Sequence, residues 1–134
     1  MNLNTLISSS DQAHFKRQLR ARADVLRTEI HDVLLRNDRE RYADIAGQVH
    51  DAEEEAIADL LVDVSLAEIT RDVQEIRDID AALRRIATGG YGTCVRCKEP
   101  ISRDRLEVYP TAKRCLSCQQ IHDRERGASA PPSL

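Results

Sequence analysis

The chain has 134 residues, a formal net charge of −3 and few aromatic side chains, namely one Phe, three Tyr and no Trp. This length suits one domain, or one small domain with an extension. Because the charged fraction is 32% and aromatic residues are scarce, long exposed helices are favoured over a compact globular core. No apolar run approaches the roughly 18 residues of a membrane span, and residues 1–10 lack the basic start of a signal peptide. We therefore expect a cytoplasmic protein with no membrane contact.

The first helix is expected to follow a flexible N-terminus at residues 1–10. Ser8-Ser9-Ser10-Asp11 offers several N-cap residues. The helix should run to about Ala46, because Gly47 is a helix breaker and residues 48–51 are typical of a turn. Its apolar residues recur at four-three-four-three spacing, the stripe of a coiled coil: Leu19, Ala23, Leu26, Ile30 and Val33.

A second helix is expected from Asp51 or Glu53 to the C-cap signal Gly89-Gly90. Two amphipathic helices joined by a short turn should pair antiparallel, with both stripes as core. Arms of this length would make a rod of roughly 50 Å, covering residues 11–87 with its tip near 47–56. The spacing of the second stripe drifts between three and four: Ile57, Leu61, Val64, Leu66, Ile69, Val73, Ile76, Ile79, Leu83 and Ile86.

Charge is unevenly placed along the chain. From Asp38 to Asp80 there are fourteen acidic residues against four arginines, a net −10, whereas residues 88–127 carry eight Lys and Arg against five acids, a net +3. An acidic middle is unfavourable on DNA, where affinity comes mainly from Lys and Arg against phosphate. It suits a basic partner or a metal ion, and we expect no sequence-specific DNA binding.

The four cysteines form two pairs, Cys94-x-x-Cys97 and Cys115-x-x-Cys118, separated by seventeen residues. This spacing predicts a zinc site, and four thiolate ligands leave no position open, so the zinc would be structural. Two disulfides are the alternative, but nothing suggests an oxidising compartment. A redox role is secondary, because zinc-bound thiolates are already occupied.

The zinc finger with its C-terminal helix should occupy residues 88–127, followed by a disordered tail at 128–134. Loosely alternating Ile101, Leu106, Val108 and Tyr109 predict a short β-hairpin between the cysteine pairs, and residues 119–126 are compatible with a helix. The expected fold is mainly α: a long antiparallel helical hairpin (a coiled coil), a small four-cysteine zinc-finger module and a short C-terminal helix.

In this order of parts the chain resembles the DksA/TraR family of bacterial RNA polymerase regulators, over roughly residues 10–127. The residues that carry the resemblance are Tyr91-Gly92-Thr93-Cys94-Val95-Arg96-Cys97, Ile101, Arg105-Leu106-Glu107, Pro110-Thr111-Ala112 and Cys115-Leu116-Ser117-Cys118.

The resemblance implies a regulator that binds RNA polymerase and inserts its hairpin into the secondary channel, near the active-site Mg²⁺. The family's tip signature, Asp-x-x-Asp-x-Ala, falls on Asp51, Glu54 and Ala56, with Glu in place of the second Asp. Arg103 and Arg105 are candidate polymerase contacts. No Ser/His/Asp or Cys/His set is apparent, so we expect no enzyme.

Family members that respond to the alarmone ppGpp resemble one another in carrying basic residues around the zinc module. This chain has Tyr109, Gln119 and Asp78 at three of those places. The resemblance therefore implies weak dependence on ppGpp, or none.

Two other functions compete with this hypothesis. A zinc-ribbon nucleic-acid-binding protein would need a strongly basic finger with stacking aromatic residues, and this finger has only a modest positive excess. A helper in transcript cleavage or elongation, as in the Gre factors, would need the tip acids to hold Mg²⁺. The phosphate contacts of a nucleic-acid-binding protein would be Arg96, Lys98, Arg103, Arg105, Lys113 and Arg114.

Overall fold

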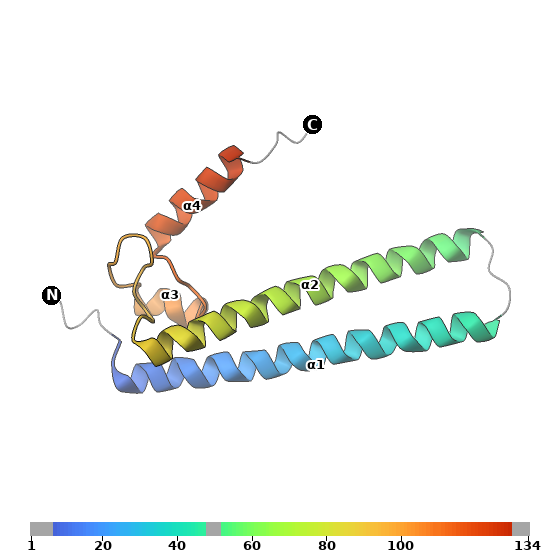
Figure 1. Ribbon diagram of the computed structural model, residues 1–134, viewed down its shortest axis with the longest axis horizontal. Helices are drawn as coiled ribbons and strands as arrows, with labels where there is room; N and C mark the ends of the chain where they lie inside the picture. The colour runs from blue at the N-terminus through green and yellow to red at the C-terminus, as the bar shows by residue number, and fades with distance from the viewer. Residues whose placement is uncertain (1–6, 48–51, 130–134) are drawn as a thin grey trace. The chain divides into compact units, whose positions relative to one another are not determined.

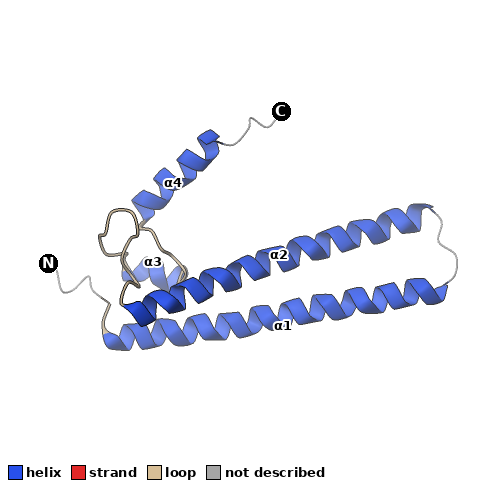
Figure 2. Ribbon diagram, in the orientation of Figure 1, coloured by secondary structure: helices blue, strands red, loops and turns tan. Residues whose placement is uncertain are grey.

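The computed structural model describes residues 7–47 and 52–129, except for the side chains of residues 39–47, 52–59, 61, 128 and 129. The helices of these residues are α1 (Ser9–Gly47), α2 (Ala52–Thr88), α3 (Arg103–Val108) and α4 (Leu116–Ser129) (Figure 1). The described part of the chain contains no strand, and Figure 2 shows only loops between its helices. The predicted mainly α fold is confirmed.

The chain packs as two compact units. One, here called the hairpin unit, is Ala21–Asp78; the other, the zinc unit, combines Met1–Arg20 with Ile79–Leu134. The base of the predicted hairpin thus belongs to the zinc unit by its packing. The predicted domain boundaries instead follow the elements along the sequence, and they stay a prediction.

In the hairpin unit, α1 and α2 run antiparallel (Figure 1). Ala23, Leu26 and Val33 of the first predicted stripe are buried in this unit. Exposed ion pairs connect the helices at their flanks: the Arg22 guanidinium donates to Glu75 at 3.2 Å, and Arg36 lies 3.8 Å from Glu68. Such exposed pairs contribute about 0–1 kcal/mol each, so apolar burial supplies most of the pairing energy.

The second predicted stripe is only partly core. Ile79 is fully buried, but Val64 and Leu66 are 53% and 54% exposed, so the prediction is wrong at these two residues. Residues two apart on a helix lie about 200° apart around its axis. Val64 and Leu66 therefore cannot both face one partner helix. The side chains of Ile57 and Leu61 lie outside the described residues.

The predicted helix caps are confirmed in the zinc unit. The Ser8 hydroxyl accepts from the backbone N–H of Asp11 at 3.1 Å, and the Asp11 carboxylate accepts from the Ser8 N–H at 3.3 Å. This reciprocal pair satisfies donors that the first turn of α1 leaves unpaired. At the end of α2, Gly89 adopts a φ of +87°, and the N–H of Gly90 returns to the Arg85 carbonyl at 2.9 Å. Glycine allows this left-handed residue without strain.

The core of the zinc unit joins the start of α1 to the segments around the cysteines. Phe15, Tyr91 and Leu106 are buried, and the rings of Phe15 and Tyr91 lie 5.8 Å apart. The Tyr91 hydroxyl donates to the Pro110 carbonyl at 2.7 Å, and burial raises the pKa of this phenol well above its usual value. Gly92 has a φ of +82°, and a Cβ there would collide with Ile7. The zinc module is therefore packed on the N-terminal helix.

The predicted β-hairpin between the cysteine pairs is wrong, because residues 103–108 form α3. Ser102 caps this helix, with its side chain accepting from the Arg105 N–H at 3.2 Å. Leu106 is buried, whereas Val108 is 87% exposed. The apolar alternation was therefore not the side-chain pattern of a strand.

Candidate metal centre

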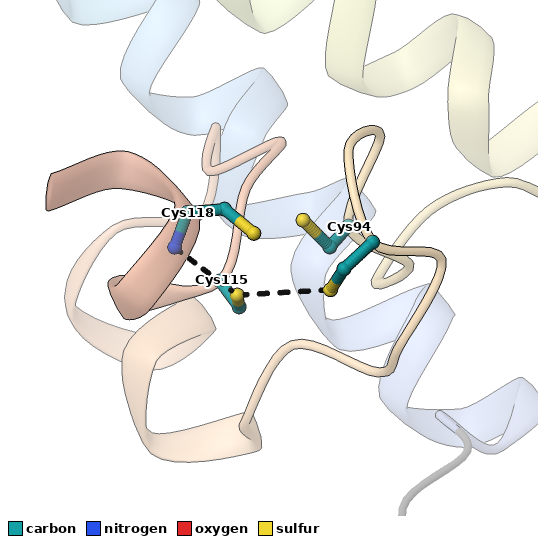
Figure 3. A group of neighbouring side chains, drawn as sticks. Cys94, Cys115 and Cys118 are labelled. Atoms are coloured by element: carbon teal, nitrogen blue, oxygen red, sulfur yellow. Dashed lines mark hydrogen bonds between the residues drawn. The ribbon is translucent and has the colours of Figure 1, made fainter. Parts of the chain in front are cut away.

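The four cysteine sulfurs converge on one point. All lie within 4.8 Å of one another, and Sγ of Cys97 is 3.9 Å from Sγ of Cys115. Figure 3 shows the sulfurs of Cys94, Cys115 and Cys118 turned toward a common centre. A tetrahedral zinc with Zn–S bonds of about 2.3 Å places neighbouring sulfurs about 3.8 Å apart. The observed spacing fits that geometry.

Two backbone motifs position the ligands. The first pair sits on a tight turn, in which the Cys94 N–H donates to the Glu99 carbonyl at 2.8 Å and the Lys98 N–H donates to the Cys94 carbonyl at 3.0 Å. The second pair lies at the start of α4, where the Cys118 N–H donates to Sγ of Cys115 at 3.5 Å. This bond explains why α4 begins at Leu116, three residues earlier than predicted.

The two halves of the site are joined by backbone bonding. The Val95 N–H, inside the first cysteine pair, donates to the Lys113 carbonyl at 2.9 Å. An exposed ion pair adds a second connection, with Arg96 3.3 Å from Glu125 of α4. Cys94 and Cys118 are buried, whereas Cys97 is exposed. The centre is therefore enclosed on one side and open on the other.

The thiols do not share one electrostatic environment. Burial acts to raise the pKa of Cys94, but backbone N–H groups of Cys97, Cys115 and Arg96 outweigh it and lower that pKa. The pKa of Cys118 is raised, first by its hydrogen bond to Cys115 and then by burial. The backbone thus favours the thiolate of Cys94, whereas the surroundings of Cys118 disfavour its thiolate and a bound cation would favour it.

The donor set fits a zinc ion in a structural role. Four thiolates are soft ligands that complete a tetrahedron, so no coordination position is left for a substrate. A zinc ion bound there would supply a charge that holds all four sulfurs deprotonated and would link folding of the module to metal binding. The predicted cofactor, one structural zinc, is confirmed by this convergence together with the zinc-finger match reported below.

The predicted tip residues are not placed by the structure. Asp51 lies outside the described residues, and Glu54 and Ala56 belong to the first turns of α2, where side chains are not described. Their role stays a prediction.

The two candidate polymerase contacts have partners within the zinc unit. Arg103 donates to Asp11 at 3.1 Å and lies 3.4 Å from Glu107. Arg105 donates to the Arg114 carbonyl at 3.1 Å, and its guanidinium lies 5.6 Å from the centre of the Tyr109 ring. Both side chains therefore help to hold the zinc unit together, whatever else they contact.

Sequence reasoning missed an open cavity of about 420 Å³ beside the ligands, lined in part by Arg105, Tyr109, Cys115 and Leu116. It also missed the pair of His14 and Glu107, whose side chains meet at 3.0 Å. Neither feature has a sequence signal, because each depends on how separate segments meet in space.

Comparison with known proteins finds relatives of both the hairpin and the zinc module. Residues 89–124 match the family described as prokaryotic dksA/traR C4-type zinc finger. The chain is 36% identical over 115 residues to the RNA polymerase-binding transcription factor DksA of Caulobacter vibrioides, covering 83% of this chain and 75% of that protein. It is 26% identical over 115 residues to the protein of the same name from Escherichia coli K12, covering 86% and 73%.

The fold is shared with a solved structure, transcription factor DksA2 from Pseudomonas aeruginosa. The TM-score is 0.77 at 23% sequence identity, covering 92% of this chain and 91% of the other. A helical hairpin followed by a site of four cysteines, with no coordination position left open, is thus the architecture of a C4 zinc-finger protein. The chain belongs to the DksA/TraR family. No helix in the described part of the chain has an apolar stretch of the length and hydropathy that a membrane crossing requires.

Proposed function

We propose that this protein is a transcription regulator that binds RNA polymerase, inserts the tip of its hairpin into the secondary channel and modulates initiation. The observation that carries this proposal is the 36% identity to a relative named as an RNA polymerase-binding transcription factor, over 83% of this chain. Such a match covers both the hairpin and the zinc module. Because RNA polymerase acts in the cytoplasm, the proposal includes a cytoplasmic location.

The sequence and the packing suggest different roles for the hairpin tip and for its base. The tip sequence, from Asp51 through Glu54 to Ala56, carries acids that could reach a cation-rich catalytic centre at the end of a narrow channel. The zinc module is held on the base of α1 by Phe15 and Tyr91. Arg103 and Arg105 at this base are our candidates for contacts with the outer surface of polymerase.

The competing functions have less support. Direct nucleic-acid binding would need more than the net +3 of residues 88–127. The relatives are named transcription factors rather than enzymes, which favours regulation of initiation over a helper role in transcript cleavage. We further propose little dependence on ppGpp, because the positions expected to be basic are Tyr109, Gln119 and Asp78.

The Asp51→Asn variant tests this function. We expect it to bind core polymerase nearly as tightly as wild type but to lose its effect on transcription from an rRNA-type promoter, because the charge at the tip is removed while the binding surfaces remain. In vitro transcription and a binding titration at one moderate salt concentration measure the two properties. Asp24→Asn, on an exposed face of α1, is the matched control. An Asp51→Asn protein that regulates as well as wild type contradicts the assignment of the tip.

A further inference from the structure

Two large apolar side chains of α2 in the hairpin unit are exposed. Leu60 and Val64 are one helical turn apart and are 61% and 53% exposed. Another apolar row of α2 has four-three-four-three spacing. It begins with the exposed Val62 and Leu66 and continues in partly buried residues: Ile69, Val73 and Ile76. Leu60 and Val64 are each two residues from Val62, which is about 200° around the helix. Leu60 and Val64 therefore lie on a different side of α2 from Val62.

The apolar character of this segment therefore exceeds what the hairpin itself needs. Leu60, Val62, Val64 and Leu66 are all exposed within seven residues. A helix that is apolar on more than one face is normally buried on more than one face. Leu60 and Val64, one turn apart, offer a partner a continuous apolar surface, which a single exposed residue does not.

The negative charge around Leu60 and Val64 indicates which kind of partner could bind them. No Lys or Arg occurs between Arg41 and Arg71, a stretch with eight acidic residues: Asp44, Asp51, Glu53, Glu54, Glu55, Asp59, Asp63 and Glu68. A second copy of the chain would bring the same negative charge to this surface, and like charges at an interface disfavour association. A nucleic acid or an anionic membrane is repelled for the same reason. The complementary surface is a protein surface that is apolar at its centre and bordered by Lys and Arg.

We propose that Leu60 and Val64 form a docking strip, in which both side chains enter an apolar patch of a protein partner while the flanking acids pair with basic residues at its rim. The strip rests on the proposed function in that the partner is RNA polymerase. It is distinct from the tip, because it supplies binding affinity and no chemistry at the catalytic centre. A few buried apolar residues surrounded by a charged rim supply most of the affinity in many interfaces.

The test uses the zinc-loaded full chain and core RNA polymerase in a titration followed by fluorescence anisotropy. Double substitution Leu60→Ser with Val64→Ser should weaken binding about tenfold, as expected for loss of central interface residues. The matched control is Val25→Ser with Leu34→Ser, which removes two side chains of similar exposure, 48% and 49%, from α1. It should bind within about twofold of wild type. If the serine variant loses helicity in circular dichroism, Leu60→Ala with Val64→Ala removes the apolar surface with a better helix former.

The outcomes separate the strip from the proposed function. Equal binding by wild type and the strip variant overturns the strip but leaves the polymerase regulator intact. Failure of wild type to bind polymerase overturns both. A wild-type dimer in sedimentation, made monomeric by the strip substitutions, overturns the assignment to polymerase and gives the surface to a second copy.

Discussion

At the scale of single residues, our proposal of weak dependence on ppGpp rests on three side chains. Tyr109 lies beside the Arg105 guanidinium, Gln119 donates to Asp123 at 2.9 Å, and Asp78 accepts from Gln74 at 3.1 Å. None of the three supplies a positive charge. Polyphosphates are held by several Lys or Arg through charge-assisted hydrogen bonds. Among the described residues, Arg105 alone brings a basic side chain to the lining of the cavity beside the zinc site.

We therefore expect ppGpp to add little to the effect of this protein on a sensitive promoter. The measurement is in vitro transcription at fixed protein concentration, with the nucleotide titrated. The polymerase used should have no ppGpp site of its own, so that any response depends on this protein. A Tyr109→Arg and Gln119→Lys double variant is the comparison, and it should gain response because it restores positive charge at two of the expected positions. A several-fold enhancement with the wild-type protein would refute the prediction.

Residues with a strong local or periodic signal could be assigned from sequence alone. The paired spacing of the cysteines predicted their convergence. The caps were predicted within residues 8–11 and at residues 89–90, because capping depends on a few neighbouring residues, and the structure places them at Ser8 and Gly89. The pair of His14 and Glu107, 93 residues apart in sequence, could not be predicted, because nothing local signals such a contact.

At the scale of elements, the segment after α2 combines a small apolar core with the site of four cysteines. The helices described in that segment are the short α3 and α4, and both lie next to the cysteine pairs. α3 was mistaken for a strand because six residues are too few to reveal a helical period, and its N-cap at Ser102 was the better signal. The long helices were recognised because their apolar period persists over many turns.

Loss of zinc should unfold the module but not the hairpin. For Cys115→Ser we expect loss of amide protection over about residues 88–127, because folding of the module is linked to the metal, while α1 and α2 keep much of their helicity. Hydrogen exchange with mass spectrometry and metal analysis give the two readouts. The matched control is Ser117→Ala, which changes a residue between the ligands Cys115 and Cys118. This variant should still hold one zinc per chain. A Cys115→Ser protein with native protection across the module would show that zinc does not fold it.

At the scale of the whole molecule, charge and architecture favour the same partner. The net −10 between Asp38 and Asp80 contrasts with the net +3 of residues 88–127, so the two parts suit different surfaces of one large partner. Electrostatic complementarity of this kind sets orientation and association rate more than affinity. The affinity would then come from apolar contacts such as the docking strip and from the surface of the zinc unit.

The most direct test of the account is to locate the tip on polymerase by photo-cross-linking. A benzoyl-phenylalanine placed at His50, next to Asp51 in the sequence, should cross-link to polymerase residues around the catalytic Mg²⁺ when the zinc-loaded protein is bound. The same probe at Val25, an exposed residue of α1, should give no product at the catalytic centre. Cross-links from His50 that map only to the outer surface of polymerase, or none at saturating binding, would contradict insertion of the tip into the secondary channel.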